Sequence, residues 1–122
     1  MKPNPVLVLL GHGSKSKKTL EEMTELAARL QAASTGLTVL PAFLSLLEPD
    51  LPQAVASAVR AGAEEIHILP LFLFSGKHVL EDIPALVERL RAAHPQIRLS
   101  LREPLGRHGG FFDLLLQAGG FA

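Results

Sequence analysis

The sequence predicts an α/β domain of the three-layer sandwich class, in which a four-stranded parallel sheet with strand order 2-1-3-4 lies between helices. Two observations predict this fold. Four short apolar runs alternate with four longer stretches that have helical spacing. The 122 residues are 48% hydrophobic and contain no linker or low-complexity tract, so residues 1–122 are expected to form a single domain with its own core.

The first strand and helix are predicted from the start of the chain. The run at 6–10 is short and uniformly apolar, which is typical of a strand buried on both faces of a parallel sheet. A Gly-His-Gly-Ser segment follows, and its glycines allow a sharp turn. Apolar residues then recur three and four positions apart over 19–33, which predicts an amphipathic helix that Ser14 or Ser16 can cap.

The second strand and helix carry position-specific signals. Residues 37–43 are typical of a strand, and Pro41 within them favours either a position at the sheet edge or an early end of the strand. Asp50 is a good N-cap, with Pro52 in the first helical turn, and this helix is expected to end near residue 61.

The same alternation continues to the C-terminus. Strands are expected at 65–69 and 97–101, and helices at 79–93 and 111–117. Helices that alternate with short apolar strands connect parallel strands by right-handed crossovers, which restricts the possible strand orders and favours 2-1-3-4.

Two histidines are predicted to meet at one edge of this sheet. With the order 2-1-3-4, the first and third strands are neighbours and the order reverses between them. His12 follows the first strand, and His78 lies at the end of a loop expected after the third. Because ligands of open α/β sheets bind at such a reversal, we expect both histidines to line one crevice.

Paired imidazoles suit metal chemistry and proton transfer. Neutral imidazole binds Co²⁺, Ni²⁺, Fe²⁺ and Zn²⁺, and near neutral pH it also accepts protons. Two imidazoles without thiolates form a weak site that is better suited to passing a metal on than to keeping it. The alternative is that each histidine is an ordinary polar loop residue.

Basic residues surround the expected crevice. Lys15, Lys17, Lys18 and Lys77 lie beside the two histidines, and Arg107 lies in the fourth loop. Together with helix N-termini they would attract an anionic ligand, although they can equally be solvated surface charges.

Other residues near this edge leave alternatives open. Some members of the apolar run 71–74 must fill the core, and one or two can instead line a flat apolar pocket or a subunit interface; the core is favoured for any single member. Glu48 is either an accessory carboxylate for the metal or a plain helix-flanking charge, and the second reading is favoured. His108 lies on the fourth loop, from which it could approach the site, whereas His67 is expected to pack or pair within its strand.

Composition excludes several classes of protein. Twelve basic residues balance twelve acidic ones, which gives no indication of a nucleic-acid partner. No apolar run approaches the roughly 20 residues of a membrane span. The absence of cysteine excludes thiolate metal centres. Together with an N-terminus unlike a signal peptide, it favours a cytoplasmic protein. No phosphate-binding glycine motif or nucleophile elbow occurs.

The loop motifs together resemble the small class II chelatases, in their short, single-domain form similar to sirohydrochlorin cobaltochelatase. The resemblance covers nearly the whole chain. It is carried by Gly11-His12-Gly13-Ser14, by Ala42-Phe43-Leu44 with Pro49, and by the segment 70–78 (PLFLFSGKH) with Asp82-Ile83-Pro84.

This resemblance implies a flavodoxin-like fold of the chelatase type and the insertion of a divalent metal into a tetrapyrrole. Co²⁺ is favoured, with Ni²⁺ and Fe²⁺ as alternatives, and the ring is sirohydrochlorin or a relative used for cobalamin, sirohaem or related cofactors. His12 and His78 would bind the metal and assist loss of the pyrrole protons. No organic cofactor is implied. A non-catalytic carrier of metal or tetrapyrrole is the alternative.

The resemblance also implies a set of substrate contacts and an assembly. The substrate-binding residues would be Gly13, Ser14, Lys15, Phe74, Ser75, Gly76 and Lys77. Many relatives have an acidic residue where this chain has Ser45, which leaves the third metal ligand open. Larger relatives join two such domains around a cleft, and a homodimer of this chain would rebuild that cleft.

Overall fold

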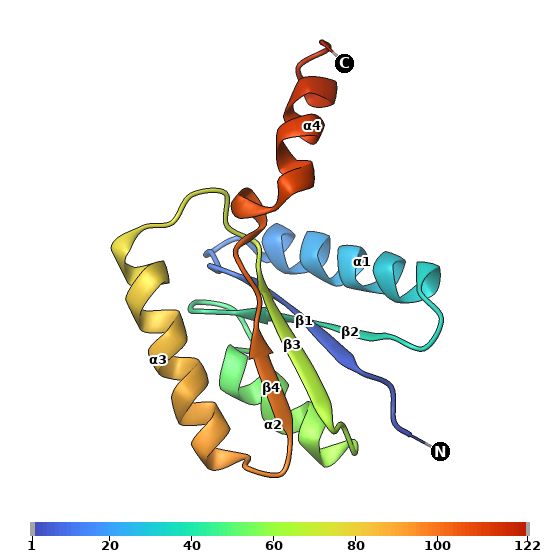
Figure 1. Cartoon of the computed structure of the whole chain (residues 1–122), viewed down its shortest axis with the longest axis vertical. Helices are drawn as coiled ribbons and strands as arrows, with labels where there is room; N and C mark the ends of the chain where they lie inside the picture. Colours follow the sequence, from blue (N-terminus) through green and yellow to red (C-terminus); the bar gives the residue numbers. More distant parts are fainter. Residues whose placement is uncertain (1, 122) are drawn as a thin grey trace.

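The chain forms a parallel α/β domain in a computed structural model that describes residues 2–121, apart from the side chains of His78 and Leu80 (Figure 1). The described elements are β1 (Val6–Gly11), α1 (Lys17–Ala33), β2 (Thr38–Phe43), α2 (Leu51–Arg60), β3 (Glu65–Pro70), α3 (Lys77–Ala93), β4 (Arg98–Leu101), a short 3₁₀ turn η1 (Leu105–Arg107) and α4 (Gly109–Ala118). Every expected strand and helix is therefore present, with boundaries shifted by a few residues.

The sheet has the predicted topology. Its four strands are all parallel, in the order β2-β1-β3-β4. β1 lies at the centre, with Val8 opposite Leu40 of β2 and Ile68 of β3. β2 is an edge strand, which accommodates Pro41 because the proline cannot donate a ladder hydrogen bond.

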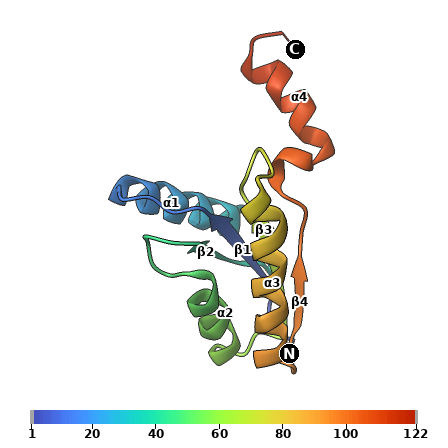
Figure 2. The same cartoon turned by 90° about the vertical axis from the view of Figure 1, so that its left-hand side faces the viewer.

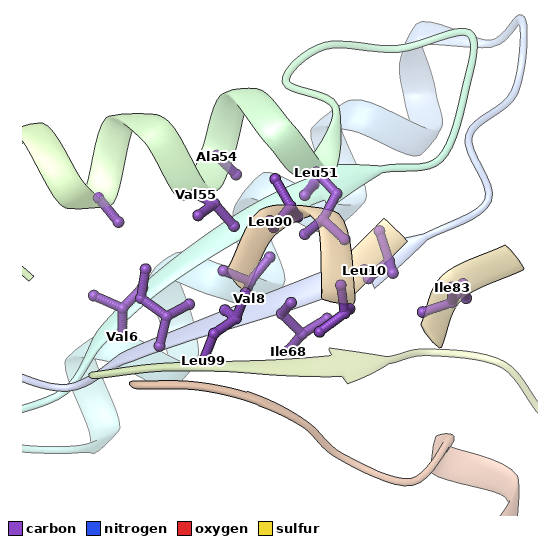
Figure 3. Close-up of a cluster of buried hydrophobic side chains, with 14 of the residues drawn as sticks. Val6, Val8, Leu10, Leu51, Ala54, Val55, Ile68, Ile83, Leu90 and Leu99 are labelled. Carbon is purple, nitrogen blue, oxygen red and sulfur yellow. The ribbon is translucent and has the colours of Figure 1, made fainter. Parts of the chain in front are cut away.

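The larger part of the core lies between the sheet and helices α2 and α3, which cover the same face (Figures 2 and 3). Its buried side chains come from alternate positions of the strands, as the pleat requires. They include Val6, Val8, Leu10, Leu51, Val55, Ile66, Ile68, Ile83, Val87 and Leu99. A smaller cluster on the other face joins α1 to β1 and β2 through Ala27, Leu9 and Val39.

Local sequence signals explain where the helices begin. The Ser16 hydroxyl oxygen accepts a hydrogen bond from Lys18 N at 3.2 Å and so caps α1. Asp50 caps α2 through a reciprocal pair of hydrogen bonds with Gln53, each 2.8 Å long. The expected loop end at His78 was wrong: Gly76 is the N-cap of α3, so His78 lies in the first turn of that helix.

The last helix belongs to neither helical layer. α4 continues from β4 and η1 away from the sheet instead of packing on it (Figures 1 and 2). None of its residues is buried. Within residues 2–121, no helix is long and apolar enough to cross a membrane.

A polar cluster lies on β3 and β4, on the sheet face opposite α2 and α3. His67 Nε2 is 2.7 Å from Glu65 Oε2, and His67 Nδ1 is 3.0 Å from the Ser100 hydroxyl. Arg98 donates to the other oxygen of Glu65. The expectation that His67 pairs locally is thereby confirmed. The hydrogen bond from His67 and the positive charge of Arg98 lower the pKa of Glu65 below its ordinary value of 4.5.

We expect this cluster to make stability depend on acid pH. Because the folded-state pKa of Glu65 is lowered, its contribution is complete above about pH 4.5 and is lost as the pH falls through the folded-state value. Urea unfolding between pH 6 and 3 should therefore show a smaller loss of stability for Glu65→Gln than for the unmodified chain. Glu64→Gln is the matched control, because it removes the adjacent exposed carboxylate. Equal losses for all three proteins would contradict the expectation.

Candidate functional site at the carboxyl edge of the sheet

His12 lies directly after β1, the central strand, and its side chain is exposed. Its ring packs against the ring of Phe72, with 4.3 Å between the centroids and 55° between the planes. Phe72 is itself 5% exposed and belongs to the main core. The imidazole is therefore accessible to solvent on one side and supported by the core on the other.

Backbone hydrogen bonds fix the main chain around His12. Leu44 N donates to Gly11 O at 3.0 Å, and Ser45 N donates to His12 O at 3.1 Å. These bonds extend the β1–β2 pairing beyond the two strands. The His12 backbone is thus held by the loop that follows β2, which restricts where its ring can lie.

Gly13 is required by two features of this turn. Its φ is +95°, a left-handed conformation that side chains disfavour. A Cβ at this position would lie 1.7 Å from Ser45 O. The Gly-His-Gly segment therefore allows two loops to approach until their backbones touch.

Ser14 organises the same turn. Its hydroxyl lies 2.8 Å from the Thr19 hydroxyl, and its oxygen accepts a hydrogen bond from Ser16 N at 3.1 Å. These bonds order the segment that leads into α1. The side chain of Lys15 is exposed.

The loop between β3 and α3 divides its apolar residues between the core and solvent. Phe72 is buried, whereas Leu73 is 50% and Phe74 86% exposed. Ser75 is half-buried, and Gly76 is the N-cap of α3. Two of the four members leave the core, as the sequence allowed for one or two of them, but the core position favoured for each single residue was wrong for Leu73 and Phe74. His78 lies in the first turn of α3, and its side chain is outside the described part of the structure.

Basic side chains are exposed around this edge. Lys15, Lys17, Lys18, Lys77 and Arg107 are all open to solvent. The helices α1 and α3 both begin on this side of the sheet, since they follow β1 and β3, and their N-termini add partial positive charge. The exposed basic side chains and the two helix N-termini can together bind an anion.

A cavity of about 640 Å³ adjoins the exit of β4. It is lined by Leu69, Arg102, Glu103, Pro104, Leu105, Arg107, His108 and Gly109. The sequence reasoning named Arg107 and His108 but missed Arg102. Arg102 directly follows the fourth strand, and that position could have indicated its place at this edge.

Glu48 and His108 each form a hydrogen bond with a nearby residue. Gln53 Nε2 donates to Glu48 Oε1 at 3.5 Å, so this carboxylate contacts the start of α2, as the plain reading expects. His108 caps α4, with Nδ1 accepting from Gly110 N at 3.0 Å. Among the side chains that the structure describes, no three His, Cys, Asp or Glu residues form a group able to hold a metal.

These features define a parallel α/β domain with an exposed, core-supported histidine and a basic surround at the carboxyl edge of its sheet. Comparison with known families agrees with this class, because the model of the CbiX family matches residues 6–118. The chain belongs to the CbiX family.

Curated relatives support this membership. The chain is 35% identical over 88 residues to a sirohydrochlorin cobaltochelatase of Methanocaldococcus jannaschii, covering 72% of this chain and 62% of that protein. It is 32% identical over 103 residues to a sirohydrochlorin ferrochelatase of Bacillus subtilis, covering 82% of this chain but only 38% of that protein. A sirohydrochlorin cobaltochelatase of Methanosarcina acetivorans is 31% identical, with 91% of both chains covered. The chain thus spans less than two thirds of the length of the first two relatives.

Solved structures show the same fold. A CbiX protein from Marinobacter aquaeolei, described as a cobalamin biosynthesis protein, superposes with a TM-score of 0.79 at 31% identity and covers 93% of this chain and 92% of its own. The sirohydrochlorin chelatase SirB of Bacillus subtilis in complex with cobalt also has a TM-score of 0.79, at 28% identity. It covers 96% of this chain, but only 49% of SirB is matched.

Proposed function

We propose that this chain inserts a divalent metal into sirohydrochlorin or a closely related tetrapyrrole. The observation that carries the proposal is the exposed imidazole of His12, supported by Phe72 at the carboxyl end of the central strand. Relatives named as sirohydrochlorin cobaltochelatase and ferrochelatase provide the substrate class. Co²⁺ is the favoured metal, with Ni²⁺ and Fe²⁺ as alternatives, since imidazole binds all three.

In this proposal His12 and His78 hold the metal before transfer. Ring nitrogens are unprotonated when they bind a metal, and they can afterwards accept protons that the pyrrole nitrogens release. Two ligands leave positions open for the ring nitrogens, so the metal can pass from the protein to the tetrapyrrole. Glu48 would act only as an accessory carboxylate, because it is already engaged with Gln53.

The surrounding residues would bind the ring and its carboxylates. Lys15 and Lys77 supply positive charge to the substrate carboxylates, and exposed Phe74 offers an apolar face to the macrocycle. Ser75 and Gly76 precede α3, and its N-terminus adds positive charge to this contact. Gly13 and Ser14 act by shaping the turn that presents His12.

We also propose that the working form is a homodimer in which two such domains face one substrate. The chain matches only 49% of the length of SirB. A second copy would supply the other wall of a cleft by two-fold symmetry.

An absorbance time course tests the proposed activity. Substoichiometric protein is mixed with sirohydrochlorin and Co²⁺, and separately with Ni²⁺ and Fe²⁺, beside protein-free controls. We expect several metallated products per protein molecule with at least one metal. A spectral change that stops at one equivalent would indicate a carrier instead, and no change with any metal would overturn the proposed substrate.

A further inference from the structure

Leu46, in the loop between β2 and α2, has a backbone conformation that leucine disfavours. Its φ is +70°, which lies in the left-handed region. Within residues 2–121, every other residue with a positive φ is a glycine, namely Gly13, Gly36, Gly62 and Gly120. Glycine adopts this conformation without a steric cost, so the leucine at position 46 makes the folded chain less stable than its backbone requires.

The loop that contains Leu46 is fixed at both ends. Before Leu46, Ser45 N donates to His12 O at 3.1 Å. After it, Pro49 O accepts a hydrogen bond from Phe43 N at 3.0 Å. Because both ends are held, the backbone at position 46 cannot relax to another conformation without the loss of these hydrogen bonds.

The Leu46 side chain does not offset this cost by packing. It is 67% exposed. It belongs to neither of the two apolar clusters that the described residues form, whereas the nearby Leu44 packs against the larger one. Strained residues persist chiefly at ligand sites, where the side chain serves binding instead of folding. The combination of strain and exposure therefore indicates that Leu46 contacts a ligand.

Leu46 flanks the candidate site at the carboxyl edge of the sheet. β1 lies between β2 and β3, and the three strands are parallel, so the loops after β2 and β3 leave the sheet on opposite sides of His12 (Figure 1). The first of these loops carries Leu46, and the second carries Phe74, which is 86% exposed. An exposed apolar residue therefore follows the strand on each side of His12.

Two apolar flanks suit a broad apolar ligand better than a metal ion or a small anion. A hydrated metal ion gains nothing from contact with leucine, and a carboxylate is recognised by basic side chains. A conjugated macrocycle has two wide apolar faces, and the removal of apolar surface from water favours its binding. Contact with such a ring would cover the part of Leu46 that the free protein exposes.

We propose that Leu46 binds the tetrapyrrole and, with Phe74 on the other flank, positions the ring beside His12. The inference rests on the proposed function for the identity of the ligand. It assigns to Leu46 a role in ring binding that does not depend on metal insertion. Leucine carries no metal-binding or titratable group, so Leu46 acts as a positioning residue.

Three substitutions at position 46 separate ring contact from backbone strain. Leu46→Asn and Leu46→Gly both suit a left-handed backbone and remove the apolar contact. Leu46→Met keeps an apolar side chain of similar volume. Sirohydrochlorin is titrated into each protein in the absence of metal and followed by the absorbance of the ring, and urea unfolding measures the stability of each variant.

We expect Leu46→Asn and Leu46→Gly to bind sirohydrochlorin about 5–30-fold more weakly than the unmodified chain, as for the loss of most of one leucine contact. Both variants should be at least as stable as the unmodified chain, and Leu46→Met should bind as tightly. In the time course with Co²⁺, Leu46→Asn should raise KM with little change in kcat, since the apolar contact is the same before and during metal transfer. Its affinity for Co²⁺ alone, measured by calorimetry, should not change.

Leu26→Asn is the matched control, because it removes a leucine that is 39% exposed in the middle of α1. It should leave the affinity for sirohydrochlorin unchanged.

The possible outcomes separate this inference from the proposed function. Tight sirohydrochlorin binding by Leu46→Asn would overturn the role of Leu46 and leave the proposed activity in place. A loss of stability in both Leu46→Asn and Leu46→Gly would show that the leucine serves the fold, and would overturn it as well. Weakened binding by these variants, with no turnover by the unmodified chain, would support the ring contact and contradict metal insertion. If the unmodified chain does not bind sirohydrochlorin, the proposed substrate and the role of Leu46 are both wrong.

Discussion

Replacing His12 by alanine is expected to lower metal insertion by about 10²–10⁴-fold, the range typical of a lost proton-transfer group. The variant loses one proposed metal ligand and one proton acceptor together. Stability should change little, because the side chain is exposed and its described contact is the ring of Phe72. Initial rates with Co²⁺ and sirohydrochlorin, beside thermal unfolding, measure both effects.

Two controls separate the chemistry of His12 from its packing. His12→Phe retains an aromatic ring beside Phe72 but has no nitrogen, so it should be as inactive as His12→Ala. His94→Ala removes an imidazole at the C-cap of α3, at the far end of that helix from the site, and should retain full activity. Turnover by His12→Ala at the rate of the unmodified chain would rule out the proposed role.

Replacing Gly13 by alanine is expected to destabilise the fold by about 2–5 kcal/mol. The left-handed backbone costs roughly 1–2 kcal/mol for a side chain. The new Cβ would meet Ser45 O at 1.7 Å, so the two loops must separate and lose backbone hydrogen bonds worth about 0.5–1.5 kcal/mol each. Urea unfolding measures the loss, and activity should fall as well because His12 is displaced.

Gly62→Ala is the matched control for this clash. Gly62 has a φ of +98°, close to the +95° of Gly13, but a Cβ there would meet nothing within 4 Å. Gly62→Ala should therefore lose only the roughly 1–2 kcal/mol of stability that the left-handed backbone costs a side chain. Equal destabilisation by the two alanines would show that the contact with Ser45 does not constrain the site.

Local signals were sufficient to predict most of the fold. Asp50 and Pro52 marked the start of α2, and the structure adds the reciprocal bond from Gln53. Pro41 indicated an edge strand, and β2 lies at the edge. These predictions succeed because caps and proline positions depend on backbone chemistry within a few residues.

The candidate site was only partly predictable. The position of His12 follows from strand order alone, because the carboxyl ends of parallel strands share one edge. The contact between His12 and Phe72 could not be predicted from strand order, because every residue of the run 71–74 is apolar and suits a core position equally well. Likewise, the apolar spacing of α4 predicts a buried face without stating which surface covers it.

The strand order has a consequence for how the chain folds. β1 is synthesised first, whereas its neighbour β3 is synthesised much later, because Val6 of β1 pairs with Ile66 of β3. At roughly 5–20 residues per second, a ribosome needs several seconds to reach that partner. During this time β1 and β2 carry an unpaired edge and apolar faces, which favours aggregation of nascent chains. We therefore expect folding to be slowed by this long-range pairing relative to helical proteins of the same size.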